Sequence, residues 1–565
     1  MEYANRGAEA LFSIMKLLTY FHTLKYVKFS QIYYRIVKCF AHPKPNEVVG
    51  TSTQCSGIWV CHPLYEQRLF AGNHVRFLNR NGAVHNEFDW NNEEYTKLWL
   101  YNLHYFDDLN ADGFDTRKQQ QINLINQWID ENPAPLGNGW EPYPASLRIV
   151  NWVKAFLSGI SPDQARLNSL AKQADFLSQD LERHILGNHL FVNAKALIFS
   201  GTYLEGTDAD SWLQTGLDIY TKELDEQVLP DGGNFELTPM YHVLMLVDLL
   251  DLINLWVTFP NKVNAIVVEK TKHVATKMID WLKIMSHNDG EISFFNDTAF
   301  GIVPKSSVVF EYATKLGIYS SLADSVISEN LTLFNLQNSG YVVVKSDEYS
   351  LISDLAQLGP SYQPGHAHAD TLSYEFSLGA QRVFVNSGIS EYGLSEERLR
   401  QRKTAAHNTV VVNDLDSSQV WSGFRVAKRA NISNRIVNRI GDNSIRFNAS
   451  HNGFKKQGVD CIHYRDWLAE NSSVTVTDKI IGDYTNAIGY LHLHPNIEIL
   501  NVTDESVLLA SDSYNILIKV CGASVSIEGA TWHPQFGITI NNKKIRFSFV
   551  RRAMSIVITW KNIKI

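Results

Sequence analysis

The stretch "GYVVVKSDEYSLISDL", Gly340–Leu355, marks the point where helical patterns in the sequence give way to strand patterns. Its β-branched residues, bounded by Gly, Ser and Asp, are typical of paired strands. Segments of the same texture recur to the end of the chain, among them "NSSVTVTDKIIG" (471–482) and "SIVITW" (555–560). Strands at this density, separated by turn residues, predict an antiparallel β-sandwich.

Before this point, from about residue 95 to 330, apolar residues recur at helical spacing. The segment "YHVLMLVDLLDLINLWV" (241–257) is apolar nearly all round, with Asp248 and Asp251 as its only charges, which predicts a buried helix. Loops rich in Gly, Pro and Asp separate such segments and indicate antiparallel helical hairpins. The chain is too long for one core, so we predict a multidomain α+β fold, with an α-helical domain over 1–335 and an antiparallel β-sandwich over 336–565.

The composition is that of a folded globular protein, with 45% hydrophobic and 19% charged residues. A formal charge of -8 argues against a general nucleic-acid binder. Five cysteines without a CxxC pair support neither a disulfide framework nor a thiolate zinc site.

The first residues, with Lys16 inside the apolar run, make a poor export signal and predict an amphipathic helix. No apolar run of about 18 residues predicts a membrane span. The expected compartment is the cytoplasm by default, with a periplasmic or envelope location as the alternative.

The stretch "GHAHADTLSYEF" (365–376) contains the densest group of chemically active side chains. If it is a strand, His366, His368 and Asp370 point to one face, about 6.6 Å apart from one to the next. His407 begins another predicted strand, and three converging imidazoles would suit zinc. The alternative is that these residues are buried and hydrogen-bonded within the sheet. One metallohydrolase pattern with this string has a histidine after the aspartate, where this chain has Thr371. Another has the string on the first strand of a parallel barrel near the N-terminus, whereas here it lies past residue 360.

The helical half offers three further groups of candidate residues. Asn188 and His189 follow a glycine at a predicted helix start, where Asn188 can equally be an N-cap. Glu236 lies in a Gly-rich loop, and Tyr241 opens the long buried helix. The polar-aromatic segment "WEPYPASLRIVNW" (140–152) is suited to line a sugar cleft, although most aromatic residues belong to a core.

Taken together, these segments resemble the heparinase II/III-type polysaccharide lyases. The resemblance covers most of the chain, from Trp99 onward. It rests on five ordered motifs: "GNHLFVNAKAL", "DGGNFELTPMYH", "DGEISFFNDTAFG", "GHAHADTLSYEF" and "AAHNTVV". It implies an incomplete (α/α) toroid followed by the β-sandwich, with the active site in a cleft between them. It also implies cleavage of an acidic, uronic-acid-containing polysaccharide or oligosaccharide by β-elimination, without an organic cofactor.

The resemblance assigns roles to four residues. It implies that Asn188 and His189 face the uronate carboxylate. It also implies that Tyr241 and His366 form the acid–base pair. We expect Tyr241 to act as the acid, or as both acid and base when both steps occur on one face. His366 is then the base for the opposite epimer, or it holds Tyr241 ionised. Five further residues are expected to contact the substrate: Trp140, Tyr143, Arg148, Glu236 and Arg402.

The resemblance also implies that His368 and His407 are structural metal ligands. The family's third ligand is an aspartate in a "VDSG"-like turn, but this chain has "VNSG", with Asn386 at that position. A neutral amide oxygen is a weaker ligand than a carboxylate. A zinc ion held by His368, Asn386 and His407 is therefore expected at partial occupancy. Val192 is a second departure, since the helix motif often carries a glutamate there.

Two other functions stay open from the sequence. One is a non-catalytic glycan-binding protein that assists surface polysaccharide assembly. The other is a zinc-dependent hydrolase built on the histidine cluster. An unsaturated sugar product distinguishes a lyase from both. The sequence does not determine the particular polysaccharide or the oligomeric state.

Overall fold

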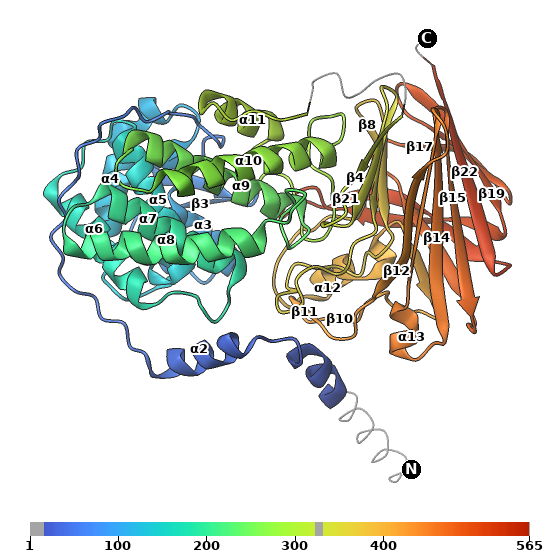
Figure 1. Ribbon diagram of the computed structural model, residues 1–565, viewed down its shortest axis with the longest axis horizontal. Coiled ribbons are helices and arrows are strands. Elements are labelled where there is room, and N and C mark those ends of the chain that lie inside the picture. The colour runs from blue at the N-terminus through green and yellow to red at the C-terminus, as the bar shows by residue number, and fades with distance from the viewer. Residues whose placement is uncertain (1–15, 323–330, 564–565) are drawn as a thin grey trace, which may run out of the picture.

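The computed structural model describes residues 16–322 and 331–563, which form a helical domain and a β-sheet domain side by side (Figure 1). The predicted toroid and antiparallel β-sandwich are confirmed. The toroid consists of α3 (Lys97–Tyr105), α4 (Lys118–Glu131), α5 (Pro142–Leu157), α6 (Gln164–Gln179), α7 (Gly187–Tyr203), α8 (Thr207–Gln227), α9 (Pro239–Thr258), α10 (Ala265–Met285) and α11 (Ser306–Lys315).

Helix α9 is the predicted buried helix, and its limits follow from its sequence. Thr238 caps it by accepting a hydrogen bond from the Tyr241 backbone N–H at 3.1 Å, and a proline follows the cap. Among the described residues, α9 is the one helix with the length and composition of a membrane span, but 83% of that window is buried inside the protein. Its surroundings in the toroid therefore account for its apolar sequence.

The two charged residues of α9 are paired inside the toroid. Lys195 of α7 lies 2.7 Å from both Asp248 and Asp251, and Lys154 of α5 lies 3.0 Å from Asp251. Buried charges require such partners because the interior solvates them poorly. The cluster therefore fixes α9 against α5 and α7.

The helical domain also contains short strands, and the sandwich domain also contains short helices. The sequence patterns did not indicate these elements. A three-stranded sheet precedes the toroid helices and is formed by β1 (Leu69–Phe70), β2 (His74–Phe77) and β3 (Arg80–Ala83). In the second domain, α12 (Glu396–Arg402) and α13 (Gly453–Gln457) lie between strands. Strands of two to four residues are too short to give a periodic signal.

The second domain contains three larger antiparallel sheets. An eight-stranded sheet follows the order β12 (Ile432–Arg439), β13 (Ser444–His451), β14 (Cys461–Glu470), β15 (Ser473–Gly482), β22 (Ala553–Asn562), β19 (Tyr514–Cys521), β18 (Ser506–Ala510), β17 (Glu498–Thr503). A five-stranded sheet consists of β4 (Thr332–Asn335), β5 (Tyr341–Lys345), β6 (Tyr349–Asp354), β7 (Tyr374–Leu378) and β8 (Gln381–Phe384). A four-stranded sheet follows the order β20 (Ala523–Trp532), β21 (Ile540–Phe549), β16 (Ala487–His492), β9 (Val410–Val412). A pair of short strands, β10 (Val420–Trp421) and β11 (Arg425–Val426), lies apart from these sheets.

Burial along the strands explains their sequences. Strand β15 alternates between buried and less buried residues, because one face packs on the sandwich core and the other faces solvent. Strand β5 is instead buried at every position. Val342 and Val344 belong to the sandwich core, whereas Tyr341 and Val343 pack with Trp281 of the toroid. The valines of the segment 340–355 therefore pack in two hydrophobic cores, one on each face of β5.

The change from helices to strands occurs between α11, which ends at Lys315, and β4, which begins at Thr332. The domain limit at 335/336 stays a prediction, although β4 is already hydrogen-bonded to β5. Residues 16–24 are helical and are followed by α2 (Phe29–Phe40). The rest of the predicted first helix lies outside the described residues.

Candidate active site

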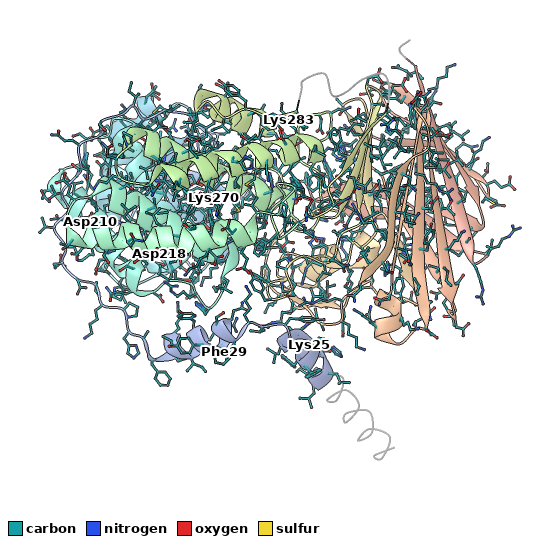
Figure 2. The ribbon with its side chains drawn as sticks, in the orientation of Figure 1. Lys25, Phe29, Asp210, Asp218, Lys270 and Lys283 are labelled. Carbon is teal, nitrogen blue, oxygen red and sulfur yellow. The ribbon has the colours of Figure 1, made fainter. Side chains whose placement is uncertain are left out.

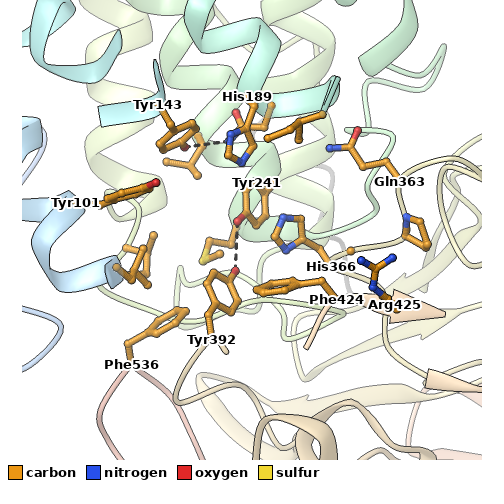
Figure 3. Close-up of a pocket in the computed structure, with 18 of the residues that line it drawn as sticks. Tyr101, Tyr143, His189, Tyr241, Gln363, His366, Tyr392, Phe424, Arg425 and Phe536 are labelled. Carbon is orange, nitrogen blue, oxygen red and sulfur yellow. Dashed lines mark hydrogen bonds between the residues drawn. The ribbon is translucent and has the colours of Figure 1, made fainter. Parts of the chain in front are cut away.

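A cavity of about 650 Å³ lies between the two domains, and residues from both line it (Figure 3). Asn188, His189 and Tyr241 reach it from the toroid, and His366 reaches it from the sandwich domain. The predicted convergence of these four side chains is therefore observed, even though 178 residues separate the first from the last. Their chemical roles remain predictions.

Asn188 and His189 lie in the first turn of α7, as the sequence predicts. The backbone preceding them is unusual, since both Leu186 and Gly187 have positive φ angles of 68° and 57°. A Cβ at Gly187 would also approach the end of the Gln363 side chain to 2.3 Å, and together with the positive φ this favours glycine here. The sharp turn directs the first residues of the helix toward the cavity.

Asn188 is not the N-cap of α7, because Leu186 occupies that position. The Asn188 amide instead donates a hydrogen bond to the Tyr143 hydroxyl at 3.0 Å. His189 Nδ1 lies 2.9 Å from the Glu182 carboxylate. Burial acts to lower the pKa of His189, but the charge and hydrogen bond of Glu182 outweigh it and raise the pKa. His189 thus carries a positive charge more readily than an ordinary histidine.

Tyr241 lies in the first turn of α9, and its hydroxyl is 3.2 Å from that of Tyr392 (Figure 3). Its ring lies over that of His366, with 4.1 Å between the centroids. Burial, and then the neighbouring Tyr392, raise the pKa of Tyr241 well above its usual value. The phenol is therefore neutral and carries a proton that it can donate.

His366 is oriented by a buried carboxylate. Its Nδ1 lies 2.8 Å from Asp297 Oδ2, and Arg398 binds both oxygens of the same carboxylate. Burial acts to raise the pKa of Asp297, but Arg398, His366 and His368 hold it well below its usual range. An ionised Asp297 accepts a proton-bearing Nδ1, which leaves Nε2 of a neutral His366 as the basic nitrogen.

Glu236 lies behind His366 and is buried, with its Oε2 3.8 Å from His366 Nε2. That oxygen has no hydrogen-bond partner among the described residues. Burial and the nearby Asp297 raise the pKa of Glu236, although His366 and His189 oppose the shift. Glu236 is not among the residues that line the cavity. It can influence His366, but its place outside the lining does not support the predicted substrate contact.

Of the five predicted substrate contacts, Tyr143 lines the cavity. The prediction is wrong for Trp140, Arg148 and Arg402, which do not line it. The Trp140 indole donates to the Asn132 carbonyl within the toroid core. Arg148 stacks on Trp128 at 3.8 Å. Arg402 donates to the Ala367 carbonyl at 2.9 Å and so supports the loop that carries His366. Each side chain is fully or almost fully buried with a partner of its own.

The predicted strand over the two histidines is also wrong. Residues 365–373 form a loop, and β7 begins at Tyr374. His366 therefore faces the cavity, whereas His368 and Asp370 are buried. Likewise, His407 follows a single 3-10 turn, and β9 begins three residues later. The alternating residues of this segment therefore belong to a loop in which one side chain faces the cavity and the others face the protein interior.

The three predicted metal ligands lie together, and none of them is a carboxylate. The rings of His368 and His407 are 5.2 Å apart, and each has one nitrogen without a hydrogen-bond partner among the described residues. Asn386 does not complete the set, because its oxygen accepts from His407 Nδ1 at 3.2 Å and its nitrogen donates to the Phe294 carbonyl. Within 16–322 and 331–563, no group of three or more His, Cys, Asp or Glu residues can hold a metal ion. Zinc binding by His368, Asn386 and His407 stays an untested prediction.

Several residues of the site had no predicted role. Asp297 lies in the motif "DGEISFFNDTAFG", and only the fold shows that its carboxylate reaches two histidines. Glu182 and Tyr392 have no sequence signal at all. The cavity lining further includes Arg35, Arg68, Tyr101, Tyr105, Asp107, Tyr362, Gln363, Tyr392, Phe424, Arg425, Arg429 and Phe536.

A helical toroid against an antiparallel β-sandwich, with a polar site between them, is a fold class shared with solved polysaccharide lyases. The chain belongs to the heparinase II/III family. Residues 15–324 match the family model "Heparinase II/III N-terminus", and residues 329–561 match "Heparinase II/III-like, C-terminal".

Individual relatives agree with this assignment. A heparin-sulfate lyase of Bacteroides stercoris is 24% identical over 399 residues, which are 65% of this chain and 55% of the relative. The chain thus spans about half the length of this curated relative. The crystal structure of heparinase III covers 84% of this chain and 78% of its own, with a TM-score of 0.65 and 16% identity. A heparan sulfate lyase HepC mutant from Pedobacter heparinus covers 87% and 81%, with a TM-score of 0.59 and 17% identity. At these identities the structures show a shared fold.

Proposed function

We propose that this chain is a polysaccharide lyase that cleaves an acidic, uronic-acid-containing polysaccharide by β-elimination. The observation that carries the proposal is the contact between Tyr241 and His366, whose rings lie 4.1 Å apart in a cavity shared with Asn188 and His189. An acid, a base and two groups suited to a carboxylate are the parts that this reaction requires.

The first requirement is to make the proton next to the carboxylate acidic enough to remove. Removing it places a second negative charge on the carboxylate group, so positive charge or hydrogen-bond donors must face that group. A protonated His189, favoured by Glu182, supplies the charge. Asn188 has a second amide hydrogen besides the one directed at Tyr143. Preorganised donors of this kind typically contribute about 100- to 1000-fold in rate.

The second requirement is the transfer of two protons. His366 Nε2 takes the proton from the carbon next to the carboxylate, because Asp297 holds Nδ1 as the donor. The bond from the neighbouring carbon to the leaving sugar oxygen breaks, and a carbon–carbon double bond forms. Tyr241 gives its phenolic proton to the leaving oxygen, which suits a phenol whose pKa burial keeps high. No step passes through a metal.

The cavity lining supports an acidic glycan as the ligand. Arginines such as Arg35 and Arg425 can meet carboxylates, while Asp107 is the acidic residue of the lining and lies 3.6 Å from Arg68. Aromatic side chains such as Tyr101 and Phe424 offer flat surfaces for sugar rings. The curated relatives are named heparin-sulfate lyases, which agrees with this ligand class.

The test is to incubate the purified chain with a panel of acidic polysaccharides and to follow the ultraviolet absorbance of the unsaturated sugar product. We expect Tyr241→Phe and His366→Ala each to lower the rate by about 100-fold or more. Tyr220→Phe is the matched control, since the Tyr220 hydroxyl bonds Thr271 in the toroid core and not the cavity. Its activity should equal that of the natural sequence.

Two results would contradict the proposal. One is glycan binding with no absorbing product from any polysaccharide in the panel, which would indicate a binding protein. The other is cleavage that leaves saturated ends and is abolished by a chelator, which would indicate a metal-dependent hydrolase.

A further inference from the structure

The segment 16–46, called here the N-terminal segment, crosses the same side of both domains (Figure 1). Tyr20 packs edge-on against Trp421 of the sandwich domain at 5.2 Å, and the Trp421 indole donates to Thr23. At the toroid, Lys28 pairs with Glu226 of α8, and Lys38 pairs with Asp180. The segment is therefore attached to the body through polar and aromatic contacts at both ends.

The helices of this segment are amphipathic, but their polar side faces the protein and their apolar side faces outward. In α2, Gln31 is buried and donates to the Ile185 carbonyl. Phe29 and Phe40 of the same helix are 81% and 78% exposed, and Ile36 is 56% exposed. A soluble helix normally buries its apolar face. Here that face has no cover in the described chain.

One apolar surface, named here the outer stripe, extends over both helices. Helical spacing aligns its members along the side that faces away from the body. It comprises Leu17, Phe21, Leu24, Phe29, Ile32, Tyr33, Ile36 and Phe40, each at least 47% exposed. Figure 2 shows Phe29 and Lys25 on this segment at the lower edge of the molecule. A contiguous exposed patch of this kind marks an interaction surface.

The charge around the outer stripe identifies the partner. Residues 16–46 contain six basic side chains and no acidic one. The whole chain carries -8, so the segment carries +6 and the remainder carries -14. Lys28 and Lys38 serve the attachment to the toroid, whereas Lys16, Lys25 and Lys44 have no ion pair with any described residue.

We propose that the N-terminal segment binds the surface of an anionic lipid bilayer, with the outer stripe inserted among the lipids and the lysines at the headgroups. Phe, Leu and Ile on one face with Lys at its margins are the composition of helices that lie in a membrane interface. The acidic remainder of the chain is repelled by an anionic surface, so charge alone orients this side toward the bilayer. The proposal is independent of the proposed lyase activity.

A second copy of this chain fits the outer stripe less well. In a two-fold symmetric dimer the same patch meets itself, so Lys16, Lys25 and Lys44 of one copy would approach the same lysines of the other. Like charges that approach one another across such an interface oppose association. An anionic bilayer instead matches both the apolar stripe and its charge.

The proposal also has a consequence for the cavity. Thr23, Val27, Gln31 and Arg35 line the cavity from the inner side of the N-terminal segment. Binding of the outer side to lipid would thus bring the cavity close to the membrane surface. A glycan attached to, or passing along, that surface would meet the cavity directly.

The test is co-sedimentation of the full chain with phosphatidylcholine vesicles, with and without about 30% phosphatidylglycerol. We expect binding to the anionic vesicles, weaker binding as salt is added, and little binding to phosphatidylcholine alone. The double variant Phe29→Ser, Ile36→Ser should lower the partition to anionic vesicles by about tenfold or more. Neither residue lines the cavity.

The matched control is Phe88→Ser with Ile58→Ser, which removes the same two residue types at positions 76% and 84% exposed elsewhere. This control should bind vesicles like the natural sequence. Failure to bind anionic vesicles, or equal losses in both double variants, would overturn the proposal. So would a dimer in light scattering that Phe29→Ser, Ile36→Ser dissociates, since the outer stripe would then cover a second copy.

Discussion

At the scale of single residues, the carboxylate of Asp297 connects the cavity to the buried histidines behind it. It lies 2.8 Å from both His366 Nδ1 and His368 Nε2, and Arg398 neutralises it. A carboxylate with these partners stays ionised and fixes the tautomer of each ring. The orientation of His366 therefore depends on a buried group that lies outside the cavity lining. The contact is invisible in the sequence, where 69 residues separate Asp297 from His366.

Glu182→Gln should move the alkaline limb of the pH profile to lower pH. The folded-state pKa of His189 is raised above its usual value, so His189 keeps its proton until the pH rises through that higher pKa. Loss of the Glu182 charge lowers the pKa, and the protonated form then disappears at lower pH. The measurement is kcat/KM against pH. Glu223→Gln, a buried glutamate bonded to Gln227 in α8, is the control and should leave the limb in place. An unchanged limb in Glu182→Gln would rule out a protonated His189.

The same pair makes a contribution to stability with a definite sign. Because folding raises the pKa of His189, the pair stabilises the fold fully below the unfolded pKa of about 6.5. The contribution is lost as the pH rises through the folded-state pKa. In Glu182→Gln this part of the pH dependence should be absent from thermal unfolding.

Asn386→Asp tests the zinc prediction. His368 and His407 each have a nitrogen without a partner among the described residues, and a carboxylate would halve the net charge of a bound zinc ion. Elemental analysis should give sub-stoichiometric zinc in the natural sequence and a rise toward about one ion per chain in the variant. Zinc in neither protein would mean that both histidines are packing residues.

At the scale of elements, the helix α9 and the strands of the sandwich domain follow directly from residue patterns. The apolar run 241–257 predicts α9, and β-branched runs predict β5 and β15. The loop 365–373 was not predictable as a loop, because its alternating residues also suit a strand. Arg148 and Arg402 were misassigned for a related reason. Arginine usually lies at the surface, and only tertiary contacts bury these two.

Lys195→Met should destabilise the toroid strongly. It leaves Asp248 and Asp251 in the core with Lys154 as their remaining cation. Breaking a buried pair in this way costs about 3–5 kcal/mol. The measurement is the free energy of unfolding in urea. Lys272→Met, which removes an exposed pair with Glu269, is the control and should cost at most about 1 kcal/mol. Similar costs for both variants would show that the α9 cluster does not fix the helix.

At the scale of the whole molecule, β5 is shared by both domains. Its alternate residues lie in the sandwich core and in the contact with the toroid. Rotating one domain away from the other would expose Tyr341, Val343 and Ile352 to water, so the packing opposes a hinge. The cavity between the domains is then a slot whose width is set by side-chain volume. If the proposed function holds, a long polymer must match that outline as it stands, and selection among sugars depends on the shape of the slot before any proton moves.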